Sequence, residues 1–482
     1  MSSVDLSSVV KTYDVRGLVP QQLNAPVARA LGAAFATVVV IPSGRTGIVI
    51  GHDMRPSSEE LVEAFSDGVT RAGIDVSNIG LASTDELYYA SGALDVPGAM
   101  FTASHNPARY NGIKLCGPAA RGISQDTGLA EMSRLAEEYL SSASLDAALP
   151  SAEVSGRYQE RDLLADYAAK LRGLVDLSGI RPLKIVIDAG NGMSGLTVPA
   201  VLGAANDLER LPLEIIELFF ELDGNFPNHE ANPLEPDNLR DLIAAVKQHD
   251  ADLGLAFDGD ADRCFAVDER GVPVSPSAVT ALVAEREIAR ARALGEERPV
   301  VLHNLITSQC VPETIARAGG RAIRTRVGHS LIKTEMARTS AVFAGEHSAH
   351  YYFRDFFGAD TGMLAALHLL SALGHTTGTL SELVAEYSQY VASGEINSTV
   401  QDAQVVLEAV RQAARSGEFG TAEIDELDGL TVSYPADGWW FNLRPSNTEP
   451  LLRLNCEAQD IGSMSSIRDR VLAIIADTGS RP

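Results

Sequence analysis

Short apolar runs of the kind that form buried strands recur along this chain in three groups of three. The members of each group are separated by segments with helical patterning, and such alternation predicts sheets that contain parallel strand pairs. The first members of the groups are residues 46–51, 183–188 and 299–304. We therefore expect an α/β protein with three related domains, each a mixed sheet flanked by helices.

The chain changes character after about residue 380. Segments 393–398 and 416–418 have the polar, glycine-containing composition of loops, whereas 438–443 is typical of a strand. This tail is predicted to form a smaller α+β domain. Because 482 residues are too many for one hydrophobic core, we expect four domains with the boundaries 1–155, 156–272, 273–378 and 379–482.

The charge balance excludes two broad classes of partner. Lys and Arg number 39, Asp and Glu number 64, and the formal net charge is −25. A field of this sign repels phosphate backbones and anionic lipids, so no nucleic acid and no membrane is expected as a partner. An anionic substrate then needs local cationic side chains to bind it.

Cysteine usage and the N-terminus indicate a cytoplasmic protein. The four cysteines are far apart and form no Cys-x-x-Cys pair, so neither a disulfide framework nor a structural zinc site is expected. The first residues lack the basic and apolar segments of a signal peptide. The most apolar early run, 31–41, is too short and too rich in alanine to span a bilayer.

Each third strand runs into a polar loop. These loops are residues 102–107 in the first group, 258–263 in the second and 345–350 in the third. Open α/β sheets bind ligands beyond the carboxyl ends of their strands. Core packing does not require polar clusters at all three positions, so we expect the loops to converge on one cleft.

In the first loop, Ser104 stands at the exit of a buried strand, with His105 next to it. A hydroxyl beside an imidazole is well placed to act as a nucleophile. The alternative is an ordinary polar loop with an Asx-type turn before Pro107. These six residues alone favour the ordinary turn, and it is the rest of the chain that favours the nucleophile.

In the second loop, Asp258, Asp260 and Asp262 alternate, so an extended conformation points all three carboxylates to one side. Three hard oxygens on one face, with Gly259 allowing a close approach, suit Mg²⁺. The alternative is a surface turn with solvated acids. The apolar strand before the loop and Arg263 after it favour the metal site.

A phosphate site is predicted near the C-terminus. Arg444, Ser446, Asn447 and Thr448 gather a guanidinium, two hydroxyls and an amide in one turn, and Arg453 adds a second guanidinium one strand later. Such donors suit a phosphate, which arginine binds through two parallel hydrogen bonds. An ordinary proline turn is the alternative.

Further polar side chains flank these loops in the sequence. Arg16 precedes a glycine in the segment that begins with Tyr13, and Lys114 lies on a strand-like stretch whose alternate face points at the serine loop. The alternative for both cations is that they are solvated surface charges. His329 lies at a strand-to-helix turn, where a helix cap by Ser330 is an equal alternative.

Together, a serine, a magnesium site, flanking cations and a phosphate clamp describe a phosphoryl-transfer centre for an anionic substrate. A serine hydrolase or a P-loop kinase fits less well, because the sequence contains neither Gly-x-Ser-x-Gly nor Gly-x-x-x-x-Gly-Lys-Ser/Thr. A metal-dependent phosphatase does not need a phosphate clamp far from Ser104.

Four motifs of this sequence resemble those of the α-D-phosphohexomutases, in the family's order and spacing. They are Thr102-Ala103-Ser104-His105-Asn106-Pro107, Asp258-Gly259-Asp260-Ala261-Asp262-Arg263, Gly345-Glu346-His347-Ser348 and Arg444-Pro445-Ser446-Asn447-Thr448-Glu449-Pro450. The resemblance extends from about Tyr13 to Arg453 and is greatest to the bacterial phosphomannomutase/phosphoglucomutase branch. It implies four domains arranged in a heart shape around a central cleft.

The resemblance also implies a chemical route. Ser104 is expected to carry a phosphoryl group, to pass it to a hexose monophosphate, and to receive the other phosphate of the resulting hexose 1,6-bisphosphate. The expected Mg²⁺ ligands are Asp258, Asp260, Asp262 and an oxygen on phosphorylated Ser104. The residues expected to act in acid–base chemistry or charge stabilisation are Arg16, His105, Lys114 and Arg263.

The substrate contacts implied by the resemblance lie in several segments. Glu346 and Ser348 are expected to hold the 3- and 4-hydroxyls of the sugar, with His329 close by and Tyr13 also at the substrate. The residues expected to hold the non-reacting phosphate are Arg444, Ser446, Asn447, Thr448 and Arg453. Because this clamp is fixed while the sugar turns over, either end of the sugar reaches Ser104.

Two departures from the family pattern concern the choice of sugar. Relatives in this branch have a substrate-contacting lysine at the end of a third-domain strand, whereas residues 304–307 contain none. His347 stands where dual-specificity relatives often have methionine and the glucosamine branch typically has glutamine.

We predict a monomeric or homodimeric enzyme that interconverts mannose 6- and 1-phosphate, with the glucose pair as further substrates. The alternatives are a phosphoglucosamine mutase and a non-catalytic sugar-phosphate sensor.

Overall fold

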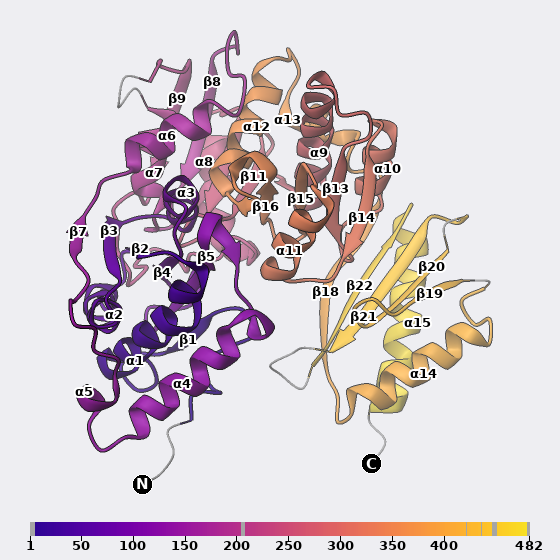
Figure 1. The fold of residues 1–482 in the computed structure, drawn as a ribbon. Helices are drawn as coiled ribbons and strands as arrows, with labels where there is room; N and C mark the ends of the chain where they lie inside the picture. Colours follow the sequence, from indigo (N-terminus) through magenta and orange to yellow (C-terminus); the bar gives the residue numbers. More distant parts are fainter. Residues whose placement is uncertain (1–4, 204–207, 421, 435, 446–450, 480–482) are drawn as a thin grey trace. The chain divides into compact units, whose positions relative to one another are not determined.

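The computed structural model describes residues 5–203, 208–420, 422–434, 436–445 and 451–479. Its strands form four sheets, with helices between them in the sequence (Figure 1). The chain divides into two compact units. The first contains Met1–Val274, His329–Ala344 and Ser348–Leu383, and the second contains Ser275–Gly328, Gly345–His347 and Val384–Pro482.

The first sheet has the strand order β1-β5-β4-β2-β3-β7, with β6 beside β5. Its strands are β1 (Val15–Leu18), β2 (Gly47–His52), β3 (Asp75–Leu81), β4 (Gly98–Phe101), β5 (Tyr110–Gly117), β6 (Arg121–Gly122) and β7 (Tyr158–Glu160). The central strand β2 is parallel to β3 and β4, and β5 returns antiparallel to β4. The loop between β4 and β5 carries Ser104.

Helices cover this sheet and supply much of its core. They are α1 (Ala25–Phe35), α2 (Ser58–Arg71), α3 (Thr84–Leu94), α4 (Leu129–Ser141) and the short α5 (Leu145–Ala148). Two glycines let α1 and α2 pack closely: a Cβ on Gly32 would lie 2.2 Å from the carbonyl oxygen of Phe65, and one on Gly68 would lie 2.1 Å from that of Arg29. Helix α2 begins one residue after Ser57, whose side chain makes no capping hydrogen bond.

The apolar run of residues 31–41 is part of a longer helical stretch than the sequence indicates. After α1 the chain continues through a π-helical turn, Ala36–Val40, and a 3₁₀ turn, Ile41–Ser43. The resulting stretch, Ala25–Ser43, is long and apolar enough to cross a membrane by length and composition, so the prediction of a run that is too short is wrong. In the structure this stretch packs against α2 and α4, and Leu31, Phe35 and Val40 are buried in the core of the first sheet.

The second sheet has the order β12-β11-β10-β8-β9. Its strands are β8 (Leu183–Asp188), β9 (Leu213–Leu218), β10 (Leu253–Phe257), β11 (Cys264–Asp268) and β12 (Pro273–Val274), and its helices are α6 (Leu164–Arg172), α7 (Ser194–Leu202) and α8 (Arg240–Gln248). The central strand β8 is parallel to β9 and β10, and β11 is antiparallel to β10. The loop between β10 and β11 carries the three aspartates.

The third sheet has the order β14-β13-β15-β16-β17. Its strands are β13 (Val300–Asn304), β14 (Arg321–Thr325), β15 (Phe343–Gly345), β16 (Tyr351–Phe353) and β17 (Ala359–Asp360). The helices of this region are α9 (Pro276–Ala293), α10 (Cys310–Arg317), α11 (His329–Thr339), α12 (Gly362–Gly374) and α13 (Leu380–Ala385). The orders β5-β4-β2-β3, β11-β10-β8-β9 and β16-β15-β13-β14 are the same, which confirms the prediction of three related α/β domains.

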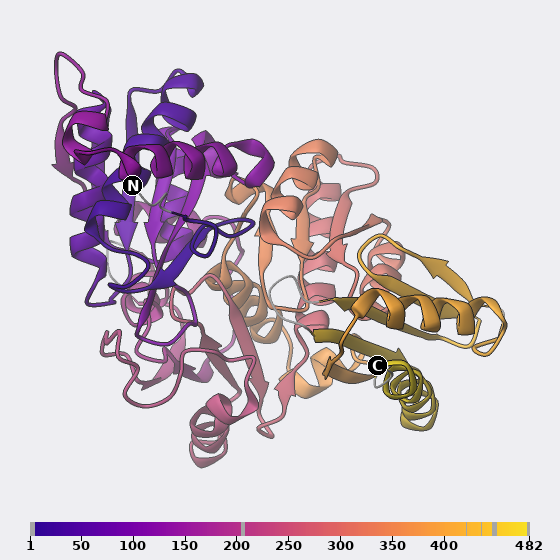
Figure 2. The ribbon, with the colours of Figure 1, turned by 90° about the horizontal axis from the view of Figure 1, so that it is seen from below.

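The C-terminal sheet has the order β18-β22-β21-β20-β19 and is antiparallel throughout. Its strands are β18 (Val391–Thr399), β19 (Glu423–Asp425), β20 (Leu430–Tyr434), β21 (Trp439–Pro445) and β22 (Leu451–Ala458). Helices α14 (Ala403–Arg415) and α15 (Ile461–Gly479) lie side by side against this sheet (Figure 2). The α+β prediction for the tail is confirmed.

One segment of this domain differs from the prediction. Residues 393–398 have a loop-like composition, but they belong to strand β18, which pairs with β22 along most of its length. The register shifts between Ala392 and Glu395, and Gly394 there has a φ of +69°, which glycine adopts without strain. The polar composition therefore reflects a bulged edge strand and not a loop.

Candidate active site

Ser104 lies in the turn that follows β4 and is buried. Its φ is +50°, in the left-handed region that residues other than glycine rarely adopt. The hydroxyl oxygen of Thr102 accepts a hydrogen bond of 2.8 Å from the backbone N–H of Ser104. A non-glycine backbone held in this conformation costs about 1–3 kcal/mol and is typical of functional sites.

Arg55 fixes this conformation of the serine loop, and the sequence reasoning missed it. Its buried guanidinium donates hydrogen bonds to four backbone carbonyl oxygens, those of Ser104 (2.8 Å), Asn106 (2.6 Å), Pro107 (3.0 Å) and Tyr110 (2.9 Å). The carboxylate of Asp53 accepts a further hydrogen bond from its Nε, at 3.1 Å. The sequence did contain a sign of this role. Asp53 and Arg55 come directly after the buried strand β2, and the polar loops have the same placement after their strands.

The three aspartates of the second loop converge, as predicted, but through a turn and not through an extended segment. The N–H of Ala261 donates to the carbonyl oxygen of Asp258 (3.0 Å), and Ala261 has a φ of +61°. This turn brings carboxylate oxygens of Asp258, Asp260 and Asp262 within 4.8 Å of one another. All three side chains are buried.

The donors around these carboxylates leave oxygens open for a cation. Lys114 Nζ lies 2.6 Å from Asp260 Oδ2 and 2.5 Å from Asp262 Oδ2, and Thr84 Oγ1 donates to Asp260 Oδ2 (2.5 Å). The Oδ1 atoms of Asp260 and Asp262 are buried without a hydrogen-bond partner. A buried, unpaired carboxylate oxygen is unfavourable, and a hard divalent cation satisfies it. The residues of this cluster therefore fit a metal ion.

Ser104 meets this cluster at Asp258. Its Oγ donates to Asp258 Oδ2 (2.8 Å), and Arg263 Nε donates to the same oxygen (2.9 Å). Arg263 Nη2 also lies 3.4 Å from Ser104 Oγ. A Cβ on Gly259 would lie 2.5 Å from the carbonyl oxygen of Ser104, so only glycine allows the two loops to touch in this way. The serine hydroxyl thus lies between a carboxylate and a guanidinium.

Burial and charge set the protonation of this cluster. Burial raises the pKa of Asp258 to about 7, although the charge of Arg263 opposes this rise. Burial acts to lower the pKa of Lys114, but the charges of Asp260 and Asp262 outweigh it and raise that pKa above its usual value. Lys114 is therefore charged, and it compensates part of the acidic cluster.

His105 is neutral at physiological pH. Burial and the nearby charge of Arg263 hold its pKa well below the ordinary value. Its Nδ1 lies 2.5 Å from Arg263 Nη2 and accepts a hydrogen bond from it. The imidazole, 3.2 Å from Ser104 Oγ, is therefore an acceptor toward Arg263 and carries no positive charge.

The structure also places Arg16 at the serine loop. Its Nη1 donates to Asn106 Oδ1 (2.5 Å) and its Nη2 contacts Asp14 at 2.6 Å. Tyr13 precedes Asp14 in the chain and is half-buried. Strand β1 pairs with β5, and this pairing brings Arg16 opposite Gly112, two residues before Lys114. Both predicted cations of the N-terminal domain thus lie next to the loop of Ser104.

The third polar loop contributes to both compact units. In the first unit His350 forms a backbone bridge with Arg263, and its Nδ1 lies 3.0 Å from Ser348 Oγ. In the second unit Glu346 is buried, and its Oε1 accepts hydrogen bonds from Asn304 Nδ2 (3.3 Å) and from the N–H of Gly328 (3.4 Å). Asn304 Oδ1 is buried without a hydrogen-bond partner, so this asparagine has an unmet acceptor beside Glu346.

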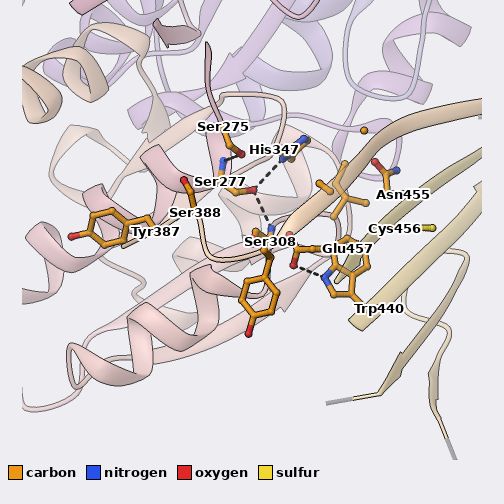
Figure 3. A pocket seen from close by; sticks show the side chains of 14 residues that line it. Ser275, Ser277, Ser308, His347, Tyr387, Ser388, Trp440, Asn455, Cys456 and Glu457 are labelled. Atoms are coloured by element: carbon orange, nitrogen blue, oxygen red, sulfur yellow. Dashed lines mark hydrogen bonds between the residues drawn. The ribbon is translucent and has the colours of Figure 1, made fainter. Parts of the chain in front are cut away.

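His347 points into a cavity of about 220 Å³ in the second unit (Figure 3). Ser277 Oγ accepts a hydrogen bond from the N–H of Ser308 (3.0 Å) and lies 3.0 Å from His347 Nδ1. Burial lowers the pKa of His347, so the ring that faces Ser277 is neutral. Trp440 and Glu457 close the cavity and are joined by a hydrogen bond of 2.9 Å.

The structure describes two residues of the predicted phosphate clamp. Arg444 on β21 and Arg453 on β22 are directly opposite each other in the strand register. Glu395 on β18 contacts both guanidinium groups, at 3.4 Å and 3.5 Å. Ser446, Asn447 and Thr448 lie outside the described residues. His329 is the first residue of α11, and its side chain also lies outside the described part of the chain.

The four cysteines are all free and buried. They are Cys116, Cys264, Cys310 and Cys456.

Four consecutive segments of the chain match family models of phosphoglucomutase/phosphomannomutase. Residues 7–140, 165–271 and 275–390 match the alpha/beta/alpha domains I, II and III, and residues 395–474 match the C-terminal domain. Among solved structures, a phosphoglucomutase/phosphomannomutase family protein from Burkholderia thailandensis superposes with a TM-score of 0.86 and 31% identity, over 99% of both chains. The phosphoglucomutase pp63/parafusin from Paramecium shares the fold, with a TM-score of 0.78 at 18% identity, over 100% of this chain and 97% of that one.

Curated relatives match over nearly the whole length. The chain is 38% identical over 466 residues to a phosphomannomutase of Escherichia coli strain K12, covering 96% of this chain and 97% of that protein. It is 37% identical over 465 residues to a protein of Xanthomonas campestris pv. campestris named phosphohexose mutases, covering 96% and 98% of the two chains. The chain therefore belongs to the phosphoglucomutase/phosphomannomutase family of α-D-phosphohexomutases.

Proposed function

We propose that this enzyme interconverts mannose 6-phosphate and mannose 1-phosphate, and that it also accepts the glucose pair. The observation that carries the proposal is the position of Ser104 Oγ, which contacts Asp258 at 2.8 Å and lies 3.4 Å from the guanidinium of Arg263. Phosphoryl transfer needs a nucleophile, a carboxylate that can bind a metal ion and a cation held in place, and all three groups meet here. Relatives at 36% identity or more are named phosphomannomutase, which supports the choice of sugar.

Ser104 is proposed to carry the phosphoryl group. A sugar hydroxyl attacks the phosphorus, the bond from phosphorus to Ser104 Oγ breaks, and its electron pair returns to Oγ. The attacking hydroxyl gives up its proton and Oγ takes one up, so the step is balanced. The bisphosphate then turns over, and Oγ attacks its other phosphate in the reverse sense. Arg263 and Lys114 stabilise the charge that develops on the transferred group, while Arg16 and His105 line the serine loop.

Mg²⁺ is proposed as the metal of this site. Asp258, Asp260 and Asp262 supply its oxygen ligands, with an oxygen of the phosphorylated serine as a further one. The buried Oδ1 atoms of Asp260 and Asp262, which have no hydrogen-bond partner, support this assignment. When bound, the ion neutralises charge on the phosphoryl oxygens. Thr84 and Lys114 hold the carboxylates in position through their Oδ2 atoms.

The substrate is proposed to be held at its sugar by Glu346 and Ser348, with Tyr13 and His329 also at the substrate. Its non-reacting phosphate is proposed to bind Arg444, Arg453 and the turn 446–448. Arg444 Nε is buried without a hydrogen-bond partner, and a phosphate oxygen would satisfy it. A cytoplasmic location and a monomeric or homodimeric state remain predictions from the sequence.

The assay that tests this function compares the 6-phosphates of mannose, glucose and glucosamine, each with a catalytic amount of glucose 1,6-bisphosphate. Formation of the 1-phosphate is followed by phosphorus NMR. We expect turnover of mannose 6-phosphate, slower or equal turnover of the glucose compound, and none with Ser104→Ala. Turnover of glucosamine 6-phosphate alone, or stoichiometric release of inorganic phosphate, would overturn the proposal.

A further inference from the structure

We propose that Glu395 is an internal counter-anion of the phosphate clamp. It occupies the two arginines when no substrate phosphate is bound and leaves them when a phosphate arrives. The inference rests on the proposed function, because it assumes that Arg444 and Arg453 bind the non-reacting phosphate. Its consequence is that the clamp binds phosphate less tightly than two arginines alone would.

The three side chains meet across neighbouring strands of the C-terminal sheet. Arg444 and Arg453 face each other on β21 and β22, and β18 is the next strand beyond β22. Glu395 Oε2 lies 3.4 Å from Arg444 Nη2, and Glu395 Oε1 lies 3.5 Å from Arg453 Nη1. The bulge between Ala392 and Glu395 sets the register that brings this carboxylate to the two guanidinium groups.

A counter-anion is needed at this place when the site is empty. Like charges directly opposite each other on neighbouring strands are destabilising. The Arg444 side chain is only 13% exposed, so water screens its repulsion from Arg453 poorly. Glu395 therefore stabilises the arginine pair before substrate binds.

The same geometry shows that Glu395 is a replaceable partner. The Glu395 side chain is 33% exposed, so its carboxylate can turn toward water without leaving a buried charge behind. Its contacts are long for charge-assisted hydrogen bonds, which are usually about 2.7–2.9 Å. It also leaves Arg444 Nε buried and without a hydrogen-bond partner. A phosphate offers more acceptor oxygens than a carboxylate and can satisfy both Nε and Nη2 of Arg444.

This competition matters for a substrate that must turn over. On the proposed route the 1,6-bisphosphate has to leave the clamp and bind again by its other phosphate within each cycle. Without the Glu395 carboxylate the arginines would hold a phosphate longer, and affinity differences of this kind lie mostly in the dissociation rate. A carboxylate that returns to the arginines favours release.

Glu395→Gln removes the charge and keeps the shape, and the probe is inorganic phosphate titrated by calorimetry. We expect the variant to bind phosphate about three- to tenfold more tightly than the unmodified enzyme, the range expected from losing two partly exposed ion pairs. Glu423→Gln is the matched control, since it removes the same charge from an exposed position on β19 of the same sheet. The control should leave phosphate affinity unchanged. Unchanged or weaker binding by Glu395→Gln would overturn the inference.

Steady-state kinetics separate a competing anion from a purely structural one. If Glu395 competes with phosphate, KM for mannose 6-phosphate and kcat both fall in Glu395→Gln, because substrate binds more tightly and the bisphosphate is released more slowly. If Glu395 only orders the arginines, KM rises, and the inference is wrong. Should Glu395→Gln fail to fold, Glu395→Asp keeps the charge with a shorter reach and should show a smaller fall in KM.

Arg444→Gln distinguishes failure of this inference from failure of the proposed clamp. If Arg444→Gln loses phosphate affinity while Glu395→Gln does not tighten it, the clamp stands and the counter-anion is refuted. If Arg444→Gln binds phosphate as well as the unmodified enzyme, the phosphate does not bind at this arginine and the clamp itself is wrong.

Discussion

Replacing Lys114 by methionine tests the charge balance of the acidic cluster directly. The ammonium group lies 2.6 Å from Asp260 and 2.5 Å from Asp262, and both carboxylates are buried. Methionine fills a similar volume, so little of the effect comes from a cavity. Removing one partner of a buried ion pair costs about 3–5 kcal/mol because it leaves an uncompensated buried charge. We expect the metal-free variant to lose a free energy of unfolding in this range.

Urea unfolding followed by far-UV circular dichroism measures this loss, from the shift in midpoint multiplied by the slope. Trp439 and Trp440 are the only tryptophans of the chain and lie on β21, so tryptophan fluorescence reports on the C-terminal domain and provides a reference within the same sample. Lys247→Met is the control, because Lys247 is exposed and its replacement should change stability by less than about 0.5 kcal/mol.

A divalent cation should restore part of the loss in Lys114→Met. A ligand present at about one hundred times its dissociation constant stabilises the folded state by about 2.7 kcal/mol. A loss below about 1 kcal/mol in the metal-free variant would show that Lys114 does not compensate the aspartates.

Three further substitutions test other parts of the site. Thr84→Val removes the hydroxyl that holds Asp260 and should weaken Mn²⁺ binding, measured by calorimetry, about tenfold. Thr84→Ser keeps the hydroxyl and should leave Mn²⁺ affinity unchanged. Equal Mn²⁺ affinities in the two variants would exclude this role of the hydroxyl. Burial raises the pKa of Glu86 from 4.5 to about 8, so its contribution to stability is present below its unfolded pKa and is lost as the pH rises through the folded value. Glu86→Gln should therefore gain as much as about 4 kcal/mol over the unmodified protein between about pH 5 and about pH 8.5 in urea unfolding, and a difference that does not vary with pH would contradict this. Gly259→Ala places a Cβ 2.5 Å from the Ser104 carbonyl oxygen and should lower kcat about 100-fold with KM little changed, whereas full activity would show that the loops need not touch.

Much of the fold follows from local patterns in the sequence. Residues 183–188, a mostly apolar segment that ends in aspartate, form strand β8 with those bounds. The polar loops after β4 and β10 each lie at the carboxyl end of a strand, where open sheets bind ligands, and this placement follows from the sequence. The two strands belong to different sheets, so the contact between the loops depends on the packing of the two sheets' domains, which the sequence does not show. The alternation of Asp258, Asp260 and Asp262 gave the correct convergence but the wrong backbone, since a turn produces the same result.

The residues that the sequence did not reveal act on distant partners. Arg55 binds carbonyl oxygens about fifty residues further along the chain, and backbone acceptors leave no mark in a sequence. Thr84 belongs to the region of the first sheet and Asp260 to that of the second. Their side chains meet only because these two regions of the first unit pack together. Residues 393–398 became a strand through pairing with β22, so their polar composition was overridden by tertiary contacts.

Intact-mass measurement tests whether Ser104 carries the phosphoryl group. After incubation with glucose 1,6-bisphosphate, we expect a protein fraction about 80 Da heavier, the mass of one phosphoryl group. Peptide mapping should place this group on Ser104, and mannose 6-phosphate should remove it. Ser104→Ala should show neither the added mass nor turnover. A phosphoryl group on another residue, or full activity in Ser104→Ala, would contradict the account.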